Sequence, residues 1–318
     1  MSQLSLSLPS FAKINWSLQV LGKRPDGYHE VSTLLQTISL HDDLHFEVSE
    51  GDEVALSCDE PDIPTDDRNL IVRAALALRS RYHVESGVRV RLTKRIPAQG
   101  GLGGASSNAA VTLLGLAELW RVGATLHSLT ELAADIGADV PFFLVGGCTL
   151  GTGIGATLSL LPDSGCLPQY LIVITPNARV STAKAYAALS SAALTTMPTD
   201  PILSSSRKEP ISGNSVPWPP HGELGNDFES VIFDIEPEIR RAKETLSQAG
   251  AFRALLAGSG SSVFGMFADQ EAQQRAMDEI QPEAGWRVFP CVTLSRNEYV
   301  SALDSRGISF LRSFNLDF

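Results

Sequence analysis

Apolar residues recur at alternate positions, or in short β-branched runs, along much of the first half of the chain, a pattern typical of strands. The strands expected from it span residues 10–21, 31–40, 42–48 and 87–96. Residues 69–79 repeat their apolar positions every three to four residues, which predicts an amphipathic helix. The alternation also places Lys13 on a polar strand face, where a lysine side chain is usually solvated.

The second half of the chain has a pattern of its own. It predicts a buried strand at 170–175, a helix from 181, a helix at 237–250, a strand–turn–strand at 252–267, a helix at 270–281 and a strand at 286–294. This order indicates a split β-α-β arrangement. With 318 residues, we expect two domains, 1–168 and 169–318. A proline- and serine-rich insertion at 197–221 is expected to order poorly by itself.

The most unusual stretch is residues 97–110, in which Gly100, Gly101, Gly103 and Gly104 fall within five positions. Glycines offer a core no side chains, but their bare N–H groups can approach a ligand closely. Good helix formers follow from residue 105. A glycine loop that leads into a helix concentrates unpaired N–H donors and the positive end of the helix dipole at one point, which favours phosphate binding.

Simpler and better-known interpretations of these glycines fit less well. A flexible loop with an N-cap serine needs no run of glycines. The P-loop pattern fails because no lysine precedes Ser106 or Ser107, and the dinucleotide fingerprint fails because Ser106 stands where its third glycine belongs. Residues 151–156 formally fit that fingerprint but lead into an alternating stretch, so we expect a turn between strands there. Residues 257–262 lack the G-x-S-x-G of a hydrolase.

One carboxylate stands out in an apolar setting. Asp139 lies between Ala138 and Val140, and two phenylalanines follow closely. A carboxylate in such a stretch is costly unless it is paired or functional. The alternative is an aspartate that caps a helix before Pro141, and the local sequence alone favours that alternative.

Composition narrows the class of ligand. A formal net charge of −11 argues against a nucleic-acid surface, which needs a basic face. The four cysteines are widely scattered and indicate neither a disulfide framework nor a zinc site. No basic, apolar leader begins the chain and no run approaches the ~20 apolar residues of a membrane span. We therefore expect a cytoplasmic protein that binds a small molecule, with no nucleic-acid or membrane partner.

Three segments, 11–15, 97–110 and 257–262, together resemble the motifs of the GHMP kinases. Within that superfamily, residues 24–29 (RPDGYH) and 137–143 (GADVPFF) resemble the branch that phosphorylates a cytidine diphosphate-linked methylerythritol for isoprenoid precursors by the non-mevalonate route. The resemblance implies an α/β (α+β) fold with two domains and the active site in the cleft between them. It also implies ATP with Mg²⁺ as cofactor and the 2-hydroxyl of the cytidyl substrate as acceptor.

The resemblance also assigns roles to individual residues and reverses the local interpretations of two of them. Asp139 matches the catalytic aspartate and Lys13 the lysine that partners it. The ATP contacts that it implies are Pro97, Gly100, Gly101, Leu102, Gly103, Gly104, Ala105, Ser106, Ser107, Asn108, Asn69, Lys94, Gly258, Ser259 and Gly260. The implied substrate contacts are Asn15, Tyr28, His29, Thr182 and Tyr186, with Tyr28 and Tyr186 facing each other across a cytosine. Ser107 is the implied contact to the metal.

Two other functions remain open at this point. One is a different GHMP kinase, such as a homoserine or mevalonate-type enzyme, which Tyr28 and His29 disfavour. The other is a nucleotide-binding protein without catalytic activity, which the presence of both Lys13 and Asp139 disfavours.

Overall fold

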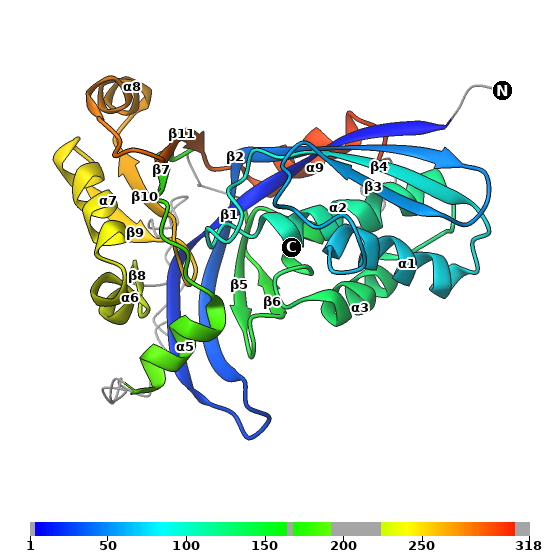
Figure 1. Cartoon of the computed structure of the whole chain (residues 1–318), viewed down its shortest axis with the longest axis horizontal. Coiled ribbons are helices and arrows are strands. Elements are labelled where there is room, and N and C mark those ends of the chain that lie inside the picture. The colour runs from blue at the N-terminus through cyan, green and yellow to red at the C-terminus, as the bar shows by residue number, and fades with distance from the viewer. Residues whose placement is uncertain (1–3, 164–167, 192–223, 309–318) are drawn as a thin grey trace, which may run out of the picture.

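Two β-sheets organise the protein, as a computed structural model describes it for residues 4–163, 168–191 and 224–308. The larger sheet and its helices lie at one end of the molecule, and the smaller sheet with its helices lies at the other (Figure 1). This mixture of helices and sheets confirms the predicted α/β (α+β) class. The insertion predicted at 197–221 lies outside the described residues.

The larger sheet has seven strands in the described part of the chain. They are β1 (Ser5–Lys23), β2 (His29–Ser49), β3 (Val54–Cys58), β4 (Gly87–Thr93), β5 (Cys148–Thr152), β6 (Thr157–Leu160) and β8 (Gly225–Asn226). The main order is β3-β4-β2-β1-β8, and β5 pairs with β2 and β6. The β3–β4 and β1–β8 pairs are parallel and the others antiparallel. Residues 153–156 form the predicted turn between two strands.

Strands β1 and β2 form one very long hairpin (Figure 1). The two strands that were predicted at 31–40 and 42–48 are a single continuous strand, and β1 extends beyond the predicted 10–21 at both ends. Their pairing shifts register at three places, between Phe11 and Ala12, between Asn15 and Ser17, and between Val20 and Gly22. Such bulges bend and twist a strand. The hairpin can therefore remain paired while it passes from the larger sheet to the side of the smaller one.

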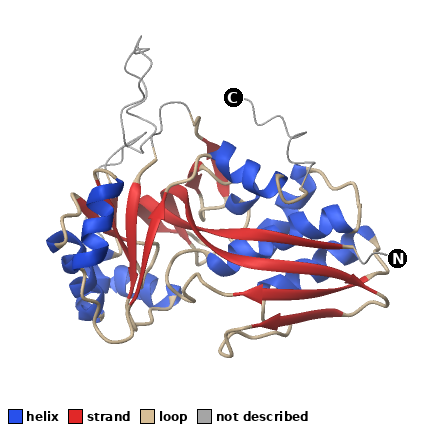
Figure 2. Ribbon diagram, turned by 90° about the horizontal axis from the view of Figure 1, so that it is seen from above, coloured by secondary structure: helices blue, strands red, loops and turns tan. Residues whose placement is uncertain are grey.

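Helices cover one face of the larger sheet (Figures 1 and 2). They are α1 (Leu70–Tyr82), α2 (Gly104–Leu119), α3 (Leu126–Ile136) and the short α4 (Phe142–Val145). Helix α2 is buried along most of its length, because its alanines and glycine let neighbouring elements approach closely. Helix α9 (Arg296–Asp304) was not predicted, and it packs Tyr299 and Leu303 into the same core although it ends the described chain.

The smaller sheet contains β7 (Tyr170–Thr175), β9 (Arg253–Leu256), β10 (Val263–Phe267) and β11 (Arg287–Val292) in the antiparallel order β11-β7-β10-β9. This order confirms the predicted split β-α-β arrangement. The helices of this half are α5 (Thr182–Ser191), α6 (Glu229–Ile235), α7 (Pro237–Gln248) and α8 (Gln270–Glu279). Among the described residues, no helix has both the length and the apolar character needed to cross a bilayer.

The long hairpin contributes to the packing of both sheets. Ile14 and Trp16 lie in a buried cluster with Val173 and Phe264 of the smaller sheet, and the Trp16 and Phe264 rings meet edge to face at 5.7 Å. Near its tip, the hairpin contributes Leu18, Val20 and Val31 to the cluster beneath α6 and α7. The hairpin of the predicted first domain, 1–168, thus packs against the predicted second, 169–318, whereas β8 and α9 of the second lie with the larger sheet and its core.

Candidate active site

The glycine loop, residues 97–103, connects β4 to α2. Gly101 and Gly103 have φ values of +76° and +71°, which favour glycine. A Cβ on Gly103 would lie 2.7 Å from the Phe143 ring, and one on Gly101 would overlap the carbonyl of Ala257. No side chain caps the N-terminus of α2. The loop therefore brings backbone close to its surroundings and leaves N–H donors of the first helical turn for another partner.

A second glycine-rich turn, residues 257–262, packs against this loop. The N–H of Ser262 donates to the carbonyl oxygen of Gly100 at 3.0 Å. The Asn226 side-chain amide donates to the carbonyl oxygens of Leu256 and Gly258 at 2.8 and 2.6 Å, which fixes the start of the turn. The structure thus brings together two of the three predicted motifs, one from each half of the chain.

Lys13 of β1 lies beside both turns. Its backbone N–H donates to the Leu102 carbonyl at 3.0 Å, and a Cβ on Gly258 would lie 3.3 Å from its Nζ. Nζ donates to Asn15 Oδ1 at 2.9 Å and lies 3.7 Å from Asp139 Oδ2. The Lys13 side chain is only 5% exposed. The solvated position expected from strand alternation is wrong, because this part of β1 is covered on both faces.

Asp139 lies in the turn between α3 and α4. Helix α3 ends at Ile136, and α4 begins after Pro141 without any side-chain cap, so Asp139 does not have the capping role that the local sequence favoured. Its carboxylate is 39% exposed. A partly exposed carboxylate beside a buried ammonium and two glycine turns can accept a proton from a ligand that enters from solvent.

An aromatic cluster forms around Tyr186 of α5. The His29 ring stacks on Tyr186 with centroids 4.6 Å apart and 19° between the planes, and Tyr186 meets Phe228 edge to face. Burial, and then the negative charge of Asp139, raise the pKa of Tyr186. Tyr28 is 63% exposed, and the ring that stacks on Tyr186 here is His29.

The start of α5 connects this cluster to the glycine turns. Thr182 Oγ1 lies 3.2 Å from Ser259 Oγ, within hydrogen-bond distance. Asn15, which accepts a hydrogen bond from Lys13 Nζ, donates from its side-chain amide to Thr33 Oγ1 at 2.7 Å. This second bond fixes the orientation of the Asn15 side chain. The predicted substrate contacts from β1 and α5 therefore border the turns predicted to hold phosphate.

Three other predicted contacts have side chains already engaged within the protein. Asn69 caps α1, where it accepts from the Ile71 N–H at 2.9 Å. Lys94 Nζ lies 2.9 Å from Asp42, and burial lowers the pKa of Lys94 while that carboxylate opposes the shift. Ser107 is fully buried and accepts a hydrogen bond from the Ser10 hydroxyl at 2.7 Å. Their predicted contacts to adenosine or metal therefore require these bonds to be shared or rearranged.

Comparison with known proteins identifies the family. Residues 69–147 match the family described as GHMP kinases N terminal domain, and residues 220–285 match GHMP kinases C terminal. A 4-diphosphocytidyl-2-C-methyl-D-erythritol kinase from Prosthecochloris aestuarii is 40% identical over 90% of this chain and 97% of its own. The chain belongs to the family of these kinases, within the GHMP kinases. A relative of the same name from Geobacter metallireducens is 37% identical over 89% of this kinase and 97% of its own length.

Solved structures agree with this assignment. A crystal structure of 4-(cytidine 5'-diphospho)-2C-methyl-D-erythritol kinase matches the kinase with a TM-score of 0.71 and 31% identity over 91% of this chain and 99% of its own. A crystal structure of L. major mevalonate kinase in complex with R-mevalonate reaches a TM-score of 0.68 at 18% identity over 92% of this chain and 97% of its own. The latter shows the shared fold alone. The kinase therefore belongs to the branch that residues 24–29 and 137–143 indicated.

Proposed function

We propose that this kinase transfers the γ-phosphoryl group of ATP to the 2-hydroxyl of 4-diphosphocytidyl-2-C-methyl-D-erythritol, a step of the non-mevalonate route to isoprenoid precursors. The observation that carries the proposal is the Lys13–Asp139 pair, which lies against both glycine turns in a chain whose relatives bear this name. We assign the reaction to the cytoplasm, because the scattered cysteines indicate a reducing compartment.

The nucleotide phosphates are assigned to the loop. Gly101 to Ser107 are the proposed source of backbone N–H donors and of the positive end of the α2 dipole, although the N–H of Ser107 already donates to the Gly103 carbonyl at 2.8 Å. The turn of Gly258, Ser259 and Gly260 closes on them. At Gly101 and Gly103 a Cβ would overlap neighbouring atoms, so only glycine fits there. This is consistent with a loop that approaches its ligand through its backbone. Pro97, Leu102, Gly104, Ala105 and Asn108 belong to the same proposed site, with Asn69 and Lys94 nearer the adenosine.

Mg²⁺ fits this site as a companion of the nucleotide. Among the described residues, no group of three or more metal-binding side chains occurs. Mg²⁺ commonly keeps several waters and binds substrate phosphates rather than an all-protein cage. Ser107 is the proposed protein contact, which requires its bond to Ser10 to be exchanged. When bound, the ion would neutralise charge on the phosphoryl group being transferred.

Lys13 and Asp139 have different roles in the proposed reaction. Asp139 accepts the proton of the substrate hydroxyl as that oxygen attacks the γ-phosphorus, and the bond to the β-phosphate oxygen breaks. Lys13 orients the carboxylate and offsets negative charge on the transferring group. Phosphoryl transfer asks little covalent chemistry of a protein, so positioning and charge stabilisation provide most of the rate. A carboxylate is a weak base, so the proton moves late, as the new bond forms.

The cytidine is assigned to the aromatic cluster. The cluster offers the rings and polar edges of His29 and Tyr186, and the exposed Tyr28 adjoins His29 in the chain. The polyol and phosphates are assigned to Thr182 and Asn15. The His29 and Tyr186 rings are in direct stacking contact, so a base that enters between two rings must separate these or use Tyr28. Base–aromatic stacking contributes about 1–3 kcal/mol per base and tolerates any base. Selectivity for cytosine then requires hydrogen bonds to its edge.

A substrate comparison tests this function. We expect purified enzyme with ATP and Mg²⁺ to phosphorylate the cytidyl substrate, and to act at least 100-fold less efficiently on free methylerythritol phosphate, because the aromatic contacts are then unused. We expect Tyr28→Ala to raise KM for the cytidyl substrate and to leave KM for ATP within twofold. Equal turnover of both acceptors by the wild-type enzyme would reject the cytidine assignment. Phosphorylation of homoserine or mevalonate instead would reject the substrate class.

A further inference from the structure

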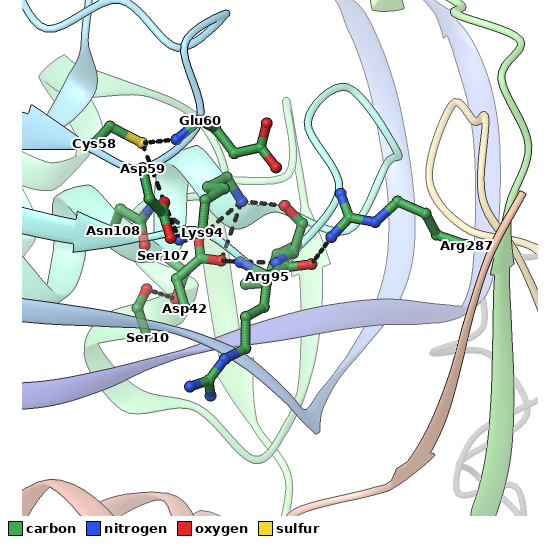
Figure 3. A network of polar contacts seen from close by, with 11 residues as sticks. Ser10, Asp42, Cys58, Asp59, Glu60, Lys94, Arg95, Ser107, Asn108 and Arg287 are labelled. Atoms are coloured by element: carbon green, nitrogen blue, oxygen red, sulfur yellow. Dashed lines mark hydrogen bonds and ion pairs between the residues drawn. The ribbon is translucent and has the colours of Figure 1, made fainter. Parts of the chain in front are cut away.

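A buried carboxylate lies beneath the glycine loop, apart from the residues of the proposed mechanism. Asp42, in β2, is fully buried, and several donors surround it (Figure 3). Its Oδ1 accepts the backbone N–H groups of Arg95 and Ile96, each at 2.7 Å. Its Oδ2 accepts the side-chain amide of Asn108 at 3.0 Å and lies 2.9 Å from Lys94 Nζ.

These contacts join the two ends of the loop. Arg95 and Ile96 come immediately before Pro97, where the loop begins, and Asn108 lies in the first turns of α2, where the loop has ended. One side chain from β2 therefore fixes both the entry and the exit of the loop. A loop fixed at both ends holds its N–H groups in a set direction, which lowers the entropy cost of binding phosphate.

The charge of the carboxylate is balanced within the same cluster. The ammonium of Lys94 contacts both Asp42 oxygens and the Ile96 carbonyl, and a Cβ on Gly104 would lie 3.3 Å from it. The side chains of Lys94 and Asp42 are 6% and 0% exposed. An unpaired carboxylate so close to the loop would repel phosphate in a setting with little solvent screening. Paired with Lys94, it anchors the loop without adding net negative charge.

The smaller sheet also contacts the segment where the loop begins. Arg287 of β11 donates from Nη2 to the Arg95 carbonyl oxygen at 2.8 Å, so the segment that Asp42 holds also carries a contact between the two sheets (Figure 3).

We propose that Asp42 is a positioning residue for the nucleotide, which holds the entry and the exit of the glycine loop so that its N–H groups converge on the phosphates. The inference rests on the proposed function, since it takes the loop as the ATP site. Asp42 is not among the residues that the mechanism places at the reacting atoms, and it acts through its contacts to Arg95, Ile96, Asn108 and Lys94.

The test is Asp42→Asn, with Asp43→Asn as the matched control. The amide keeps the shape of the side chain, but it turns a donor toward Lys94 and Asn108 and so releases one end of the loop. Asp43 is the next residue of β2, and its 46% exposed carboxylate pairs with Arg95 at the surface. We expect Asp42→Asn to raise KM for ATP at least tenfold and KM for the cytidyl substrate less than twofold. The control should change neither constant beyond twofold.

A direct binding measurement separates this role from a structural one. The Kd of a fluorescent ATP analogue, measured without turnover, should rise in parallel with KM for ATP. A merely structural role would lower the melting temperature and the active fraction while both KM values stay unchanged. Should the single variant not fold, Asp42→Glu keeps the negative charge that pairs with Lys94 but moves the carboxylate oxygens by one methylene from the N–H groups of Arg95 and Ile96, so its KM for ATP should also be raised.

The outcomes are distinguishable. An unchanged Kd and KM for ATP in a folded Asp42 variant overturns the inference while a wild-type enzyme active on the cytidyl substrate keeps the proposed function. A wild-type enzyme that binds the ATP analogue but does not phosphorylate that substrate rejects the proposed function, and a weakened Kd in Asp42→Asn would still support the positioning role.

Discussion

At the scale of the residue, Asp139 offers the sharpest test of the proposed chemistry. We expect Asp139→Asn to lower kcat by about 10²–10⁴-fold, since the amide cannot take the proton of the attacking hydroxyl. The carboxylate is 39% exposed and lies 3.7 Å from its lysine, so the variant should fold and bind ATP as the wild type does. Steady-state kinetics with a thermal melt would measure both properties.

The matched control for that experiment is Asp135→Asn. Asp135 is exposed on α3, four positions earlier, and an asparagine there removes the same charge from the same region of the surface. Its kcat should stay within twofold of the wild type. A near-wild-type kcat in Asp139→Asn would exclude this residue as the base.

Residues also differ in whether their burial could be predicted from the sequence. Position 42 shares its strand parity with Leu44 and Phe46, which are buried, so the alternation of β2 could have identified Asp42 as an inward-facing carboxylate. Lys13 is the opposite case. Its polar strand face becomes buried because the two glycine-rich turns lie against it, and those turns come from residues far away in the chain.

At the scale of the element, the glycine loop can be tested through Gly103. A Cβ there would lie 2.7 Å from the Phe143 ring and 3.0 Å from Lys13 Cγ, so the loop or the lysine must move. We expect Gly103→Val to raise KM for ATP and to lower kcat together, each by at least tenfold. Kinetics at varied ATP concentration would separate the two effects.

Gly123→Val controls for backbone strain in that experiment. Gly123 has φ of +64°, close to that of Gly103, but a Cβ on it would meet nothing within 4 Å. The control should lose about 1–2 kcal/mol of stability, because a β-branched residue is strained there, and keep its kinetic constants. If both variants bound ATP like the wild type, the loop would not be the phosphate site.

The elements that the sequence predicted best are those with local causes. Glycine runs and good helix formers place the loop and α2 without reference to the rest of the chain. Helix α9 and the continuity of β2 depend instead on residues far away in the chain. Tyr299 of α9, for example, packs into the core between the larger sheet and its helices. Contacts to distant residues were equally impossible to predict inside the site. Ser107 is bound by Ser10 of β1, and Lys94 is bound by Asp42 of β2.

At the scale of the whole molecule, the order of strands and helices was sufficient to predict the mixed class and the split β-α-β half. The predicted boundary at 168/169 follows from where the second pattern begins, although β8 and α9, which come after it, lie with the larger sheet and its core. What the pattern could not indicate is that β1 and β2 continue past the first sheet and pack on the second. Such sharing leaves no signal in local periodicity, because both parts of the hairpin simply alternate.

The shared hairpin determines whether the chain can be divided. Leu18, Val20 and Val31 complete the core beneath α6 and α7, and burying each contributes about 1.5–3 kcal/mol. Their combined loss is comparable with the whole stability of a typical protein, about 5–15 kcal/mol. We therefore expect a fragment of residues 169–318 to be unfolded by circular dichroism when it is produced alone. Produced together with residues 1–168, it should fold and restore kinase activity by complementation. A fragment that folded alone would show that this half is an autonomous unit, so that evolution could have joined it to the kinase as a finished module.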